Sequence, residues 1–286
     1  LMYASSYLGT LAGGAGLGIV LAHYGMRTTL LTQVALLLAI MMLPLFLRER
    51  PGERLLPWSA GRAMGTSSTS SAPSLATLFT RLGRAFTLRS TLLAAILALT
   101  VKIGMGVSLA IGVVCFIQEL GWSQLEYTNA TGGGAVVLGL AGSVAGGFIA
   151  DRLGARRLAI ATTIALGLLW IGFASVRPMW EHKWVVLTFI YLQEVFASTL
   201  SVSLFALFMG ISWPAVAATQ FTAYMALMNL SNTLGTWIAG RLTGELTLAQ
   251  VFSVIGMLQV SLVLILLLID PHQTRRELSR KEAEPG

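Results

Sequence analysis

Residues 91–117 read TLLAAILALTVKIGMGVSLAIGVVCFI, an apolar run that contains a single charged side chain, Lys102. A helix needs about 20 residues to cross roughly 30 Å of hydrocarbon, so this run is long enough to span a bilayer. The whole chain has the same character, because 55% of its 286 residues are hydrophobic and only 11% are charged. A soluble domain carries roughly 25% charged residues. The composition therefore excludes an ordinary soluble globule.

Similar apolar runs recur along the chain, and each approaches or exceeds the length of a membrane span. The sequence predicts an all-α integral membrane protein with about eight transmembrane helices. The predicted runs are residues 3–22, 28–47, 91–117, 128–150, 157–176, 184–208, 216–239 and 248–269.

A long polar stretch separates the second run from the third. It includes a Ser/Thr-rich segment at 66–74, which is typical of a flexible linker. Apolar residues then recur at helical spacing between arginines, which indicates an amphipathic helix on a lipid surface or, alternatively, a disordered basic loop. These residues are Leu78, Phe79, Leu82 and Phe86. The predicted divisions are 1–47, a central loop at 48–90, a six-helix segment at 91–270 and a tail at 271–286.

The basic residues predict an orientation. With eight helices, 14 of the 19 Lys and Arg residues fall on one side and four on the other, leaving only Lys102 inside a run. Because cytoplasmic loops carry the excess of Lys and Arg, the central loop and the tail are expected in the cytoplasm. The same distribution explains the net charge of +7 without a nucleic-acid partner. One cysteine and three scattered histidines predict neither a disulfide framework nor a metal site, and no cofactor is expected.

Two charged residues lie deep inside apolar runs. Lys102 is about eleven residues into its run, or about 17 Å along a helix, and Glu194 is ten residues into 184–208. Charges near the bilayer midplane are costly and face a cavity or a partner. A lysine and a glutamate at one depth predict a pair across a cavity, in which a desolvated Glu194 can bind and release a proton. The alternative is a purely structural buried pair.

The seventh run carries neutral polar residues on one face. Gln220, Tyr224 and Met228 follow at a spacing of four, Asn232 continues that face, and Asn229 lies close to its edge. The amides and the hydroxyl are predicted to contact a polar solute. Interhelical hydrogen bonds are an equally good interpretation.

A charged turn joins the fourth and fifth runs. It reads GFIADRLGARR over residues 147–157, and an aspartate followed by three arginines can form a charge relay that breaks and re-forms as helices move. It can equally be a simple positive-inside loop. The candidate gating residues here are Gly147, Asp151, Arg152, Gly154, Arg156 and Arg157.

The G-x-x-x-D-R-x-G-x-R-R pattern of this turn resembles the signature loop of the major facilitator superfamily. In that family the loop joins the second and third helices of each six-helix half. The resemblance implies a major facilitator fold in which this chain supplies helices five to twelve of twelve. The stretch at 48–90 would then be the loop between the halves, and four further N-terminal helices of the same protein would precede residue 1.

Within that superfamily, three stretches resemble the AmpG-like muropeptide permeases and their acetyl-CoA transporter relatives. These are Val101-Lys102-Ile103-Gly104, the ELGWS segment at 119–123, and Glu194 followed by the ATQF segment at 218–221. The chain departs from the group in two places. Met105 replaces an aspartate three residues after the lysine, and residues 198–201 read STLS where the group favours Gly-Met-Gly.

The resemblance implies a proton-coupled importer of a small polar solute, such as a muropeptide, in a bacterial cytoplasmic (inner) membrane. Glu194 would accept the proton or the substrate, Lys102 would be its partner or an anion ligand, and two halves would rock around a midplane site. The alternatives are a carrier for a sugar, peptide, siderophore or drug, a non-transporting sensor, or a membrane enzyme. An enzyme is not expected, because the acids are scattered and the histidines isolated.

Overall fold

The structure is a computed structural model that describes residues 6, 7, 9, 16–46, 75–271, 273, 274, 276 and 277. This part of the chain consists of helices joined by short connections and contains no strand, which confirms the predicted all-α class there. Contacts divide the chain into two units, residues 9–80 and residues 1–8 together with 81–286. Half of the run at 3–22, residues 47–74 and the tail from 278 lie outside the described residues.

The described part of the first unit is mainly the helix α2 (Leu17–Phe46). Its backbone is non-helical at Gly25, where φ is 75°, a conformation that glycine adopts without steric cost. The run predicted at 28–47 therefore begins inside a longer, kinked helix. Residues His23–Leu43 are long and apolar enough to cross a membrane.

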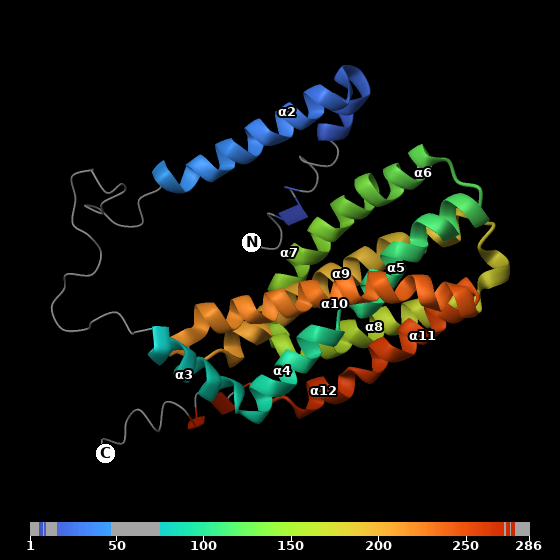
Figure 1. The fold of residues 1–286 in the computed structure, drawn as a ribbon. Helices are drawn as coiled ribbons and strands as arrows, with labels where there is room; N and C mark the ends of the chain where they lie inside the picture. Colours follow the sequence, from blue (N-terminus) through green and yellow to red (C-terminus); the bar gives the residue numbers. More distant parts are fainter. Residues whose placement is uncertain are drawn as a thin grey trace, which may run out of the picture. The chain divides into compact units, whose positions relative to one another are not determined.

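The second unit is a helix bundle. Its helices are α4 (Arg89–Thr100), α5 (Ile103–Val113), α6 (Gln124–Thr128), α7 (Ala135–Leu153), α8 (Ala155–Ser175), α9 (Lys183–Ile211), α10 (Ala217–Glu245), α11 (Leu248–Ser261) and α12 (Val263–Leu268). Two π-helical turns, η2 (Val114–Glu119) and η3 (Asn129–Gly134), extend α5 and precede α7. Figure 1 shows α8, α9, α10 and α11 running side by side. The helix α3 (Leu75–Phe86) lies where the amphipathic helix is predicted, and its contact with lipid stays a prediction.

Six helical segments of the described chain are long and apolar enough to span a membrane, which is the architecture of a multi-pass membrane protein. Besides the segment in α2, they are Arg89–Glu119, Gln124–Leu153, Ala155–Ser175, Lys183–Ile211 and Leu248–Leu268. The run predicted at 216–239 forms α10, which has 29 residues but is less apolar than these six. The polar side chains along α10 account for one of the two spans by which this differs from the eight predicted, and the other is the run at 3–22, much of which lies outside the described residues.

The helices of the bundle cross closely where glycines face a neighbouring backbone. A Cβ atom at Gly106 of α5 would overlap the Asn232 carbonyl of α10, and one at Gly235 would overlap the Ile103 carbonyl. Such contacts between small residues let membrane helices approach to backbone distance. The α5–α10 crossing therefore has no room for a side chain from either glycine.

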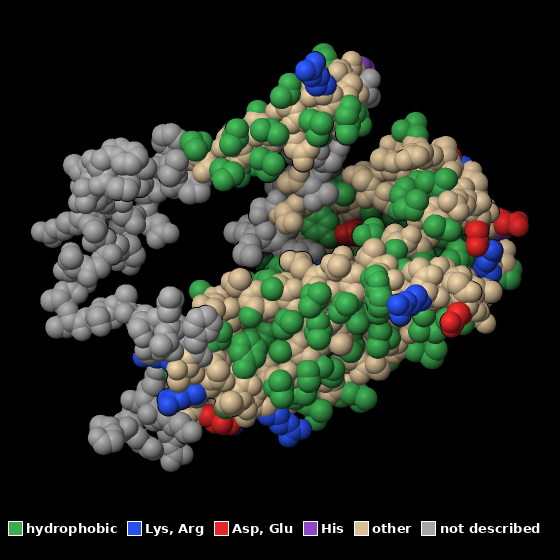
Figure 2. Space-filling view, in the orientation of Figure 1, with side chains coloured by type: hydrophobic (Ala, Val, Ile, Leu, Met, Phe, Trp, Pro, Cys, Tyr) green, Lys and Arg blue, Asp and Glu red, His purple; other side chains and the backbone are tan. Residues whose placement is uncertain are grey.

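Charged side chains gather toward the two ends of the bundle, and the surface between them is largely uncharged (Figure 2). We call one end, where α7, α9 and α12 finish and α4, α8 and α10 begin, the arginine-rich end. Its described cations are Arg81, Arg84, Arg89, Arg152, Arg156, Arg157 and Arg276, against the acids Asp151, Asp270 and Glu277. The opposite end has Arg177, Lys183 and Arg241 against Glu119, Glu126, Glu181 and Glu245. The charge difference agrees in sense with the predicted orientation, which stays a prediction.

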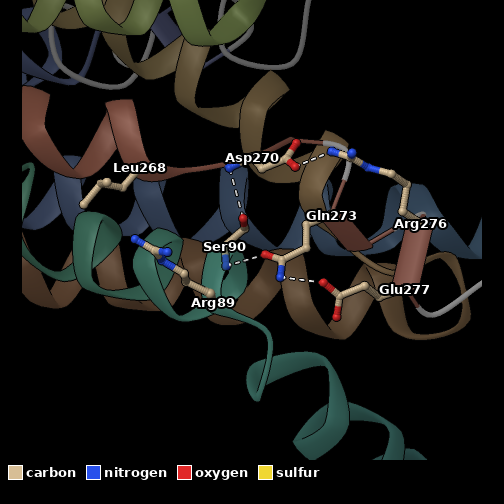
Figure 3. Close-up of a pocket in the computed structure, with 7 residues that line it drawn as sticks. All are labelled: Arg89, Ser90, Leu268, Asp270, Gln273, Arg276 and Glu277. Carbon is tan, nitrogen blue, oxygen red and sulfur yellow. Dashed lines mark hydrogen bonds and ion pairs between the residues drawn. The ribbon is translucent and has the colours of Figure 1, made fainter.

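Residues after α12 close the arginine-rich end by binding the start of α4 (Figure 3). The N-cap of α4 has no side-chain hydrogen bond of its own. The Ser90 amide donates instead to Gln273 Oε1 at 2.9 Å, and the Asp270 amide donates to Ser90 Oγ at 3.0 Å. An ion pair between Arg276 and Asp270 adds to this contact. The tail thus satisfies a backbone N–H group that a helix leaves without a partner.

Candidate functional site

The predicted span at 91–117 is interrupted at Lys102. The helix α4 ends at Thr100 and α5 starts at Ile103, while Lys102 has φ −97° and ψ 0°. In an unbroken helix the Lys102 amide would pair four residues back along the chain. Here it donates across to Ser231 Oγ on α10 at 3.0 Å. The helix break is therefore stabilised by a side chain of a neighbouring helix, as buried backbone in a membrane requires.

The Lys102 side chain reaches α9. Its Nζ donates to Ser201 Oγ at 2.9 Å, and the Ser201 hydroxyl donates in turn to the Ala197 carbonyl at 2.8 Å. Ser201 is buried, whereas Lys102 is half-buried. The ammonium therefore has a neutral partner here, and two of its three N–H groups remain available for a solute or water.

Glu194 lies eleven residues into the 29-residue helix α9, about 17 Å from its start. Its Oε1 accepts a hydrogen bond from the Tyr7 hydroxyl, and the carboxyl group is half-buried. The Tyr7 ring lies directly against Gly139 of α7, where a Cβ atom would overlap it. Tyr7 thus sits over the seam between α7 and α9 and holds the carboxyl of Glu194.

Lys102 and Glu194 lie on one side of α9 without touching. Ser201, which binds the ammonium, is seven residues or two helical turns beyond Glu194, a rise of about 10 Å. No ion pair joins these two described residues, although the Lys102 charge acts on the Glu194 carboxyl. The structure thus gives the two groups separate hydrogen-bond partners, and the predicted pair across a cavity stays a prediction. Each charge finds a hydroxyl within reach, and the rise along α9 keeps the two apart.

A neutral network lies beside Glu194. Gln193 Oε1 accepts hydrogen bonds from Ser108 Oγ of α5 at 2.8 Å and from Trp170 Nε1 of α8 at 2.7 Å. Three helices are therefore joined at the residue before Glu194. Satisfied polar networks of this kind fix side chains in one arrangement. The network positions this segment of α9.

Gln220 and Tyr224 lie fully buried in the bundle. Gln220 Oε1 accepts from the Trp213 amide at 3.0 Å, and Gln220 Nε2 donates to the Tyr224 hydroxyl at 3.1 Å. The Tyr224 ring stacks on Phe208 of α9 with centroids 4.7 Å apart. These two hydrogen bonds lie within α10 and the turn before it, while the Tyr224 hydroxyl also donates to the Thr91 carbonyl of α4 at 3.5 Å. The buried, packed arrangement favours the interhelical alternative over a solute contact.

The other two residues of the predicted α10 face are less enclosed. Asn229 is exposed and Asn232 is half-buried. The buried face continues from Met228 through Ser231 and Gly235 instead. A helix advances about 100° per residue, so each step of four residues drifts by about 40°, and Ser231 lies only about 20° around the helix from Gln220 whereas Asn232 lies about 120° from it. Asn232 is displaced to the edge of the buried face.

Five of the six predicted gating residues lie at or beside a tight turn between α7 and α8, and Gly147 lies earlier, within α7. Gly154 makes the turn with φ 89°, and Asp151 and Arg152 are exposed. Arg156 donates from Nε to the Leu266 carbonyl at 2.9 Å and from Nη2 to the Leu267 carbonyl at 2.6 Å. No ion pair links Asp151 to an arginine in the part of the chain described, so the predicted relay is not made in this structure. The arginine binds helix-end carbonyls of α12 instead.

Sequence reasoning missed the partners of the two charges, namely Tyr7, Ser201 and Ser231, and the Gln193 network. Gln193 carries a visible signal, because it is a second polar residue in an apolar run. The serines carry none, since several others occur in the same runs. No group of three or more potential metal ligands occurs among the described residues.

A scan of the chain against protein-family models and a search of curated proteins both find no match.

Proposed function

We propose that this chain belongs to a secondary transporter of the major facilitator type, resembling the AmpG-like permeases. It would import a small polar solute, such as a muropeptide or related cell-wall fragment, across a bacterial inner membrane. The inward movement of protons would drive this import. The proposal rests on the segments at 101–104, 119–123 and 147–157, on Glu194 with the segment at 218–221, and on the multi-pass helical architecture.

The observation that carries the proposal is the environment of Glu194. Glu194 is a half-buried carboxyl near the middle of a 29-residue apolar helix, where it is held by Tyr7 and acted on by the Lys102 charge. An ionisable group at this depth costs free energy, so it usually marks a functional site. Acidic residues at this depth typically belong to proton relays or substrate sites. Glu194 is therefore our candidate for the proton or substrate acceptor.

The break at Lys102 supports the same function. Secondary transporters commonly bind their substrates near the midplane, beside interrupted helices. In this chain Ser201 falls in the stretch where the sequence departs from the AmpG-like group, and it is Ser201 that binds the ammonium. We infer that the hydroxyl replaces the aspartate whose place Met105 takes. Lys102 would then keep an N–H group for an anionic part of the solute.

In the proposed cycle the six helices within 91–270 would move as one half around the site. The turn at Gly154, with Asp151, Arg152, Arg156 and Arg157, would act in gating by making and breaking contacts to α12. The Arg156 bonds to the Leu266 and Leu267 carbonyls are contacts of that kind. Gln220 and Tyr224 would support the bundle rather than bind the solute.

The proposal is tested by uptake into vesicles that contain the full-length protein. With an inward proton gradient, we expect uptake of a radiolabelled muropeptide, which the Glu194→Gln variant loses while it still inserts and folds. The control is Glu181→Gln, which makes the same change at an exposed acid next to α9. Full gradient-driven uptake by Glu194→Gln would contradict the coupling role.

A panel of other solutes separates the alternatives. Uptake of a sugar, peptide, siderophore or drug but not of the muropeptide would support the transport function and replace the proposed substrate. Absence of uptake for every solute would favour a sensor or a membrane enzyme with the same helical architecture.

A further inference from the structure

A second feature, distant from Glu194, is a pocket of about 610 Å³ at the arginine-rich end. It lies among the α7–α8 turn, the last turns of α9, and the end of α12. Its volume falls within the range of roughly 300–1,000 Å³ typical of ligand sites. Neither the proposed proton site nor the packing of the bundle accounts for it.

The pocket has a cationic part. Arg156 and Arg157 line it, and its lining includes no acidic side chain. Arg156 uses two of its N–H groups on the Leu266 and Leu267 carbonyls, which fixes the guanidinium in place. Arg157 is exposed and makes no hydrogen bond or ion pair to any residue that the structure describes. The pocket therefore presents fixed and free guanidinium donors to an anion.

The rest of the pocket is apolar. Leu153, Ile160, Leu207 and Leu267 form walls, and Gly210 leaves open space on the α9 side. A soluble anion gains nothing from such walls, whereas an acyl chain does. Because the pocket lies at the end of four apolar helices, its occupant would contact both the membrane–water interface and the hydrocarbon core of the bilayer.

The neighbouring pocket of about 370 Å³, shown in Figure 3, has a different character. Arg89 and Arg276 line it, but so do Asp270 and Glu277. Asp270 pairs with Arg276, and Glu277 accepts from Gln273 Nε2 at 2.8 Å. Its charges are balanced within the protein, so it lacks the net positive lining that would select an anion.

We propose that the larger pocket binds an anionic phospholipid, with its phosphate at Arg156 and Arg157 and an acyl chain along the leucine walls. Basic pockets between membrane helices bind anionic headgroups in this way. Planar guanidinium groups suit phosphate oxygens, because they donate two hydrogen bonds at once. The site would hold the α7–α8 turn, α9 and α12 together from the membrane side.

The test is native mass spectrometry of the full-length protein in neutral detergent with dioleoylphosphatidylglycerol or dioleoylphosphatidylcholine. We expect preferential retention of phosphatidylglycerol and about fivefold weaker retention by Arg157→Gln, the effect of one basic side chain near an anionic lipid. Gly210→Leu should weaken retention without a change of charge, because its side chain grows into the pocket where no atom lies within 4 Å.

Two controls match these variants. Arg152→Gln removes an exposed cation of the same end that does not line the pocket, and Gly240→Leu fills open space on α10. Both should retain the lipid as the wild-type protein does, with unchanged melting temperatures. Equal losses from Arg152→Gln and Arg157→Gln, full retention by Gly210→Leu, or displacement of the lipid by inorganic phosphate would each overturn the proposal.

Discussion

The helices α9 and α10 both carry polar side chains in a largely apolar bundle, but they satisfy them differently. On α10, Gln220 and Tyr224 are fully buried and bond to each other and to nearby backbone. On α9, Glu194 carries an ionisable carboxyl and is half-buried, and its partner Tyr7 comes from a segment far away in the chain. The Gln220–Tyr224 pair is fully buried inside the bundle, while the Tyr7–Glu194 pair is only partly buried.

This difference separates two roles for intramembrane polar groups. Side chains that are buried, neutral and internally bonded act as contacts between helices. A charged group at similar depth that is only partly buried is unfavourable, and packing contacts do not offset this free-energy cost. We therefore expect changes on α10 to reduce stability and changes around Glu194 to reduce transport.

The largest expected effect is that of Tyr224→Ala on stability. Removing a buried ring stacked on Phe208 leaves a cavity and should lower the free energy of unfolding by about 3–5 kcal/mol. Chemical denaturation in detergent would measure it. Uptake per folded molecule should be retained, so a pure transport defect with wild-type stability would contradict the comparison.

Lys102→Met should reduce uptake more than stability, the opposite of Tyr224→Ala. Methionine keeps most of the apolar stem but removes the ammonium from Ser201 and from the site, so uptake should fall about tenfold, equivalent to about 1.4 kcal/mol. Stability should change by less than the loss in Tyr224→Ala. Ser231→Ala is the informative companion, because it removes the bond to the Lys102 backbone and leaves the charge in place.

Tyr7→Phe tests the partner of Glu194 with a smaller change. The ring remains against Gly139, but the hydrogen bond to the carboxyl is lost, so uptake should fall about fivefold, equivalent to about 1 kcal/mol. Vesicle uptake under a proton gradient measures it. The control is Tyr191→Phe on α9, whose hydroxyl makes no hydrogen bond to a described residue. Equal effects of the two variants would remove Tyr7 from the site.

The smallest expected effect is that of Asn229→Ala. This side chain is exposed on α10, so the free energy of unfolding should stay within about 0.5 kcal/mol of wild type, and uptake should be unchanged. A clear loss of uptake with normal stability would instead support the prediction that this face of α10 contacts the solute.

The sequence predicts the helices well because their signal is local. The spans at 157–176, 184–208 and 248–269 correspond to α8, α9 and the α11–α12 segment. A long apolar run specifies its own helix. Even the polar face of α10 is visible, since the spacing of Gln220, Tyr224 and Met228 predicts that they share one face, and the structure buries all three.

The surroundings of each polar group could not be predicted in the same way. The break at Lys102 depends on Ser231, 129 residues away, and the Glu194 carboxyl depends on Tyr7, 187 residues away. Spacing within one run shows which side chains share a face but not which helix lies opposite. For the same reason the sequence places Lys102 and Glu194 at a similar depth but does not show that each has a hydroxyl partner of its own.

The hydrogen bond from the Ser90 amide to Gln273 Oε1 connects residues 183 positions apart. Ribosomes add roughly 5–20 residues per second, so about 10–40 s pass between the synthesis of the donor and that of the acceptor. During this time the start of α4 lacks this final cap. The first helix of the bundle to be synthesised is thus among the last to be completed.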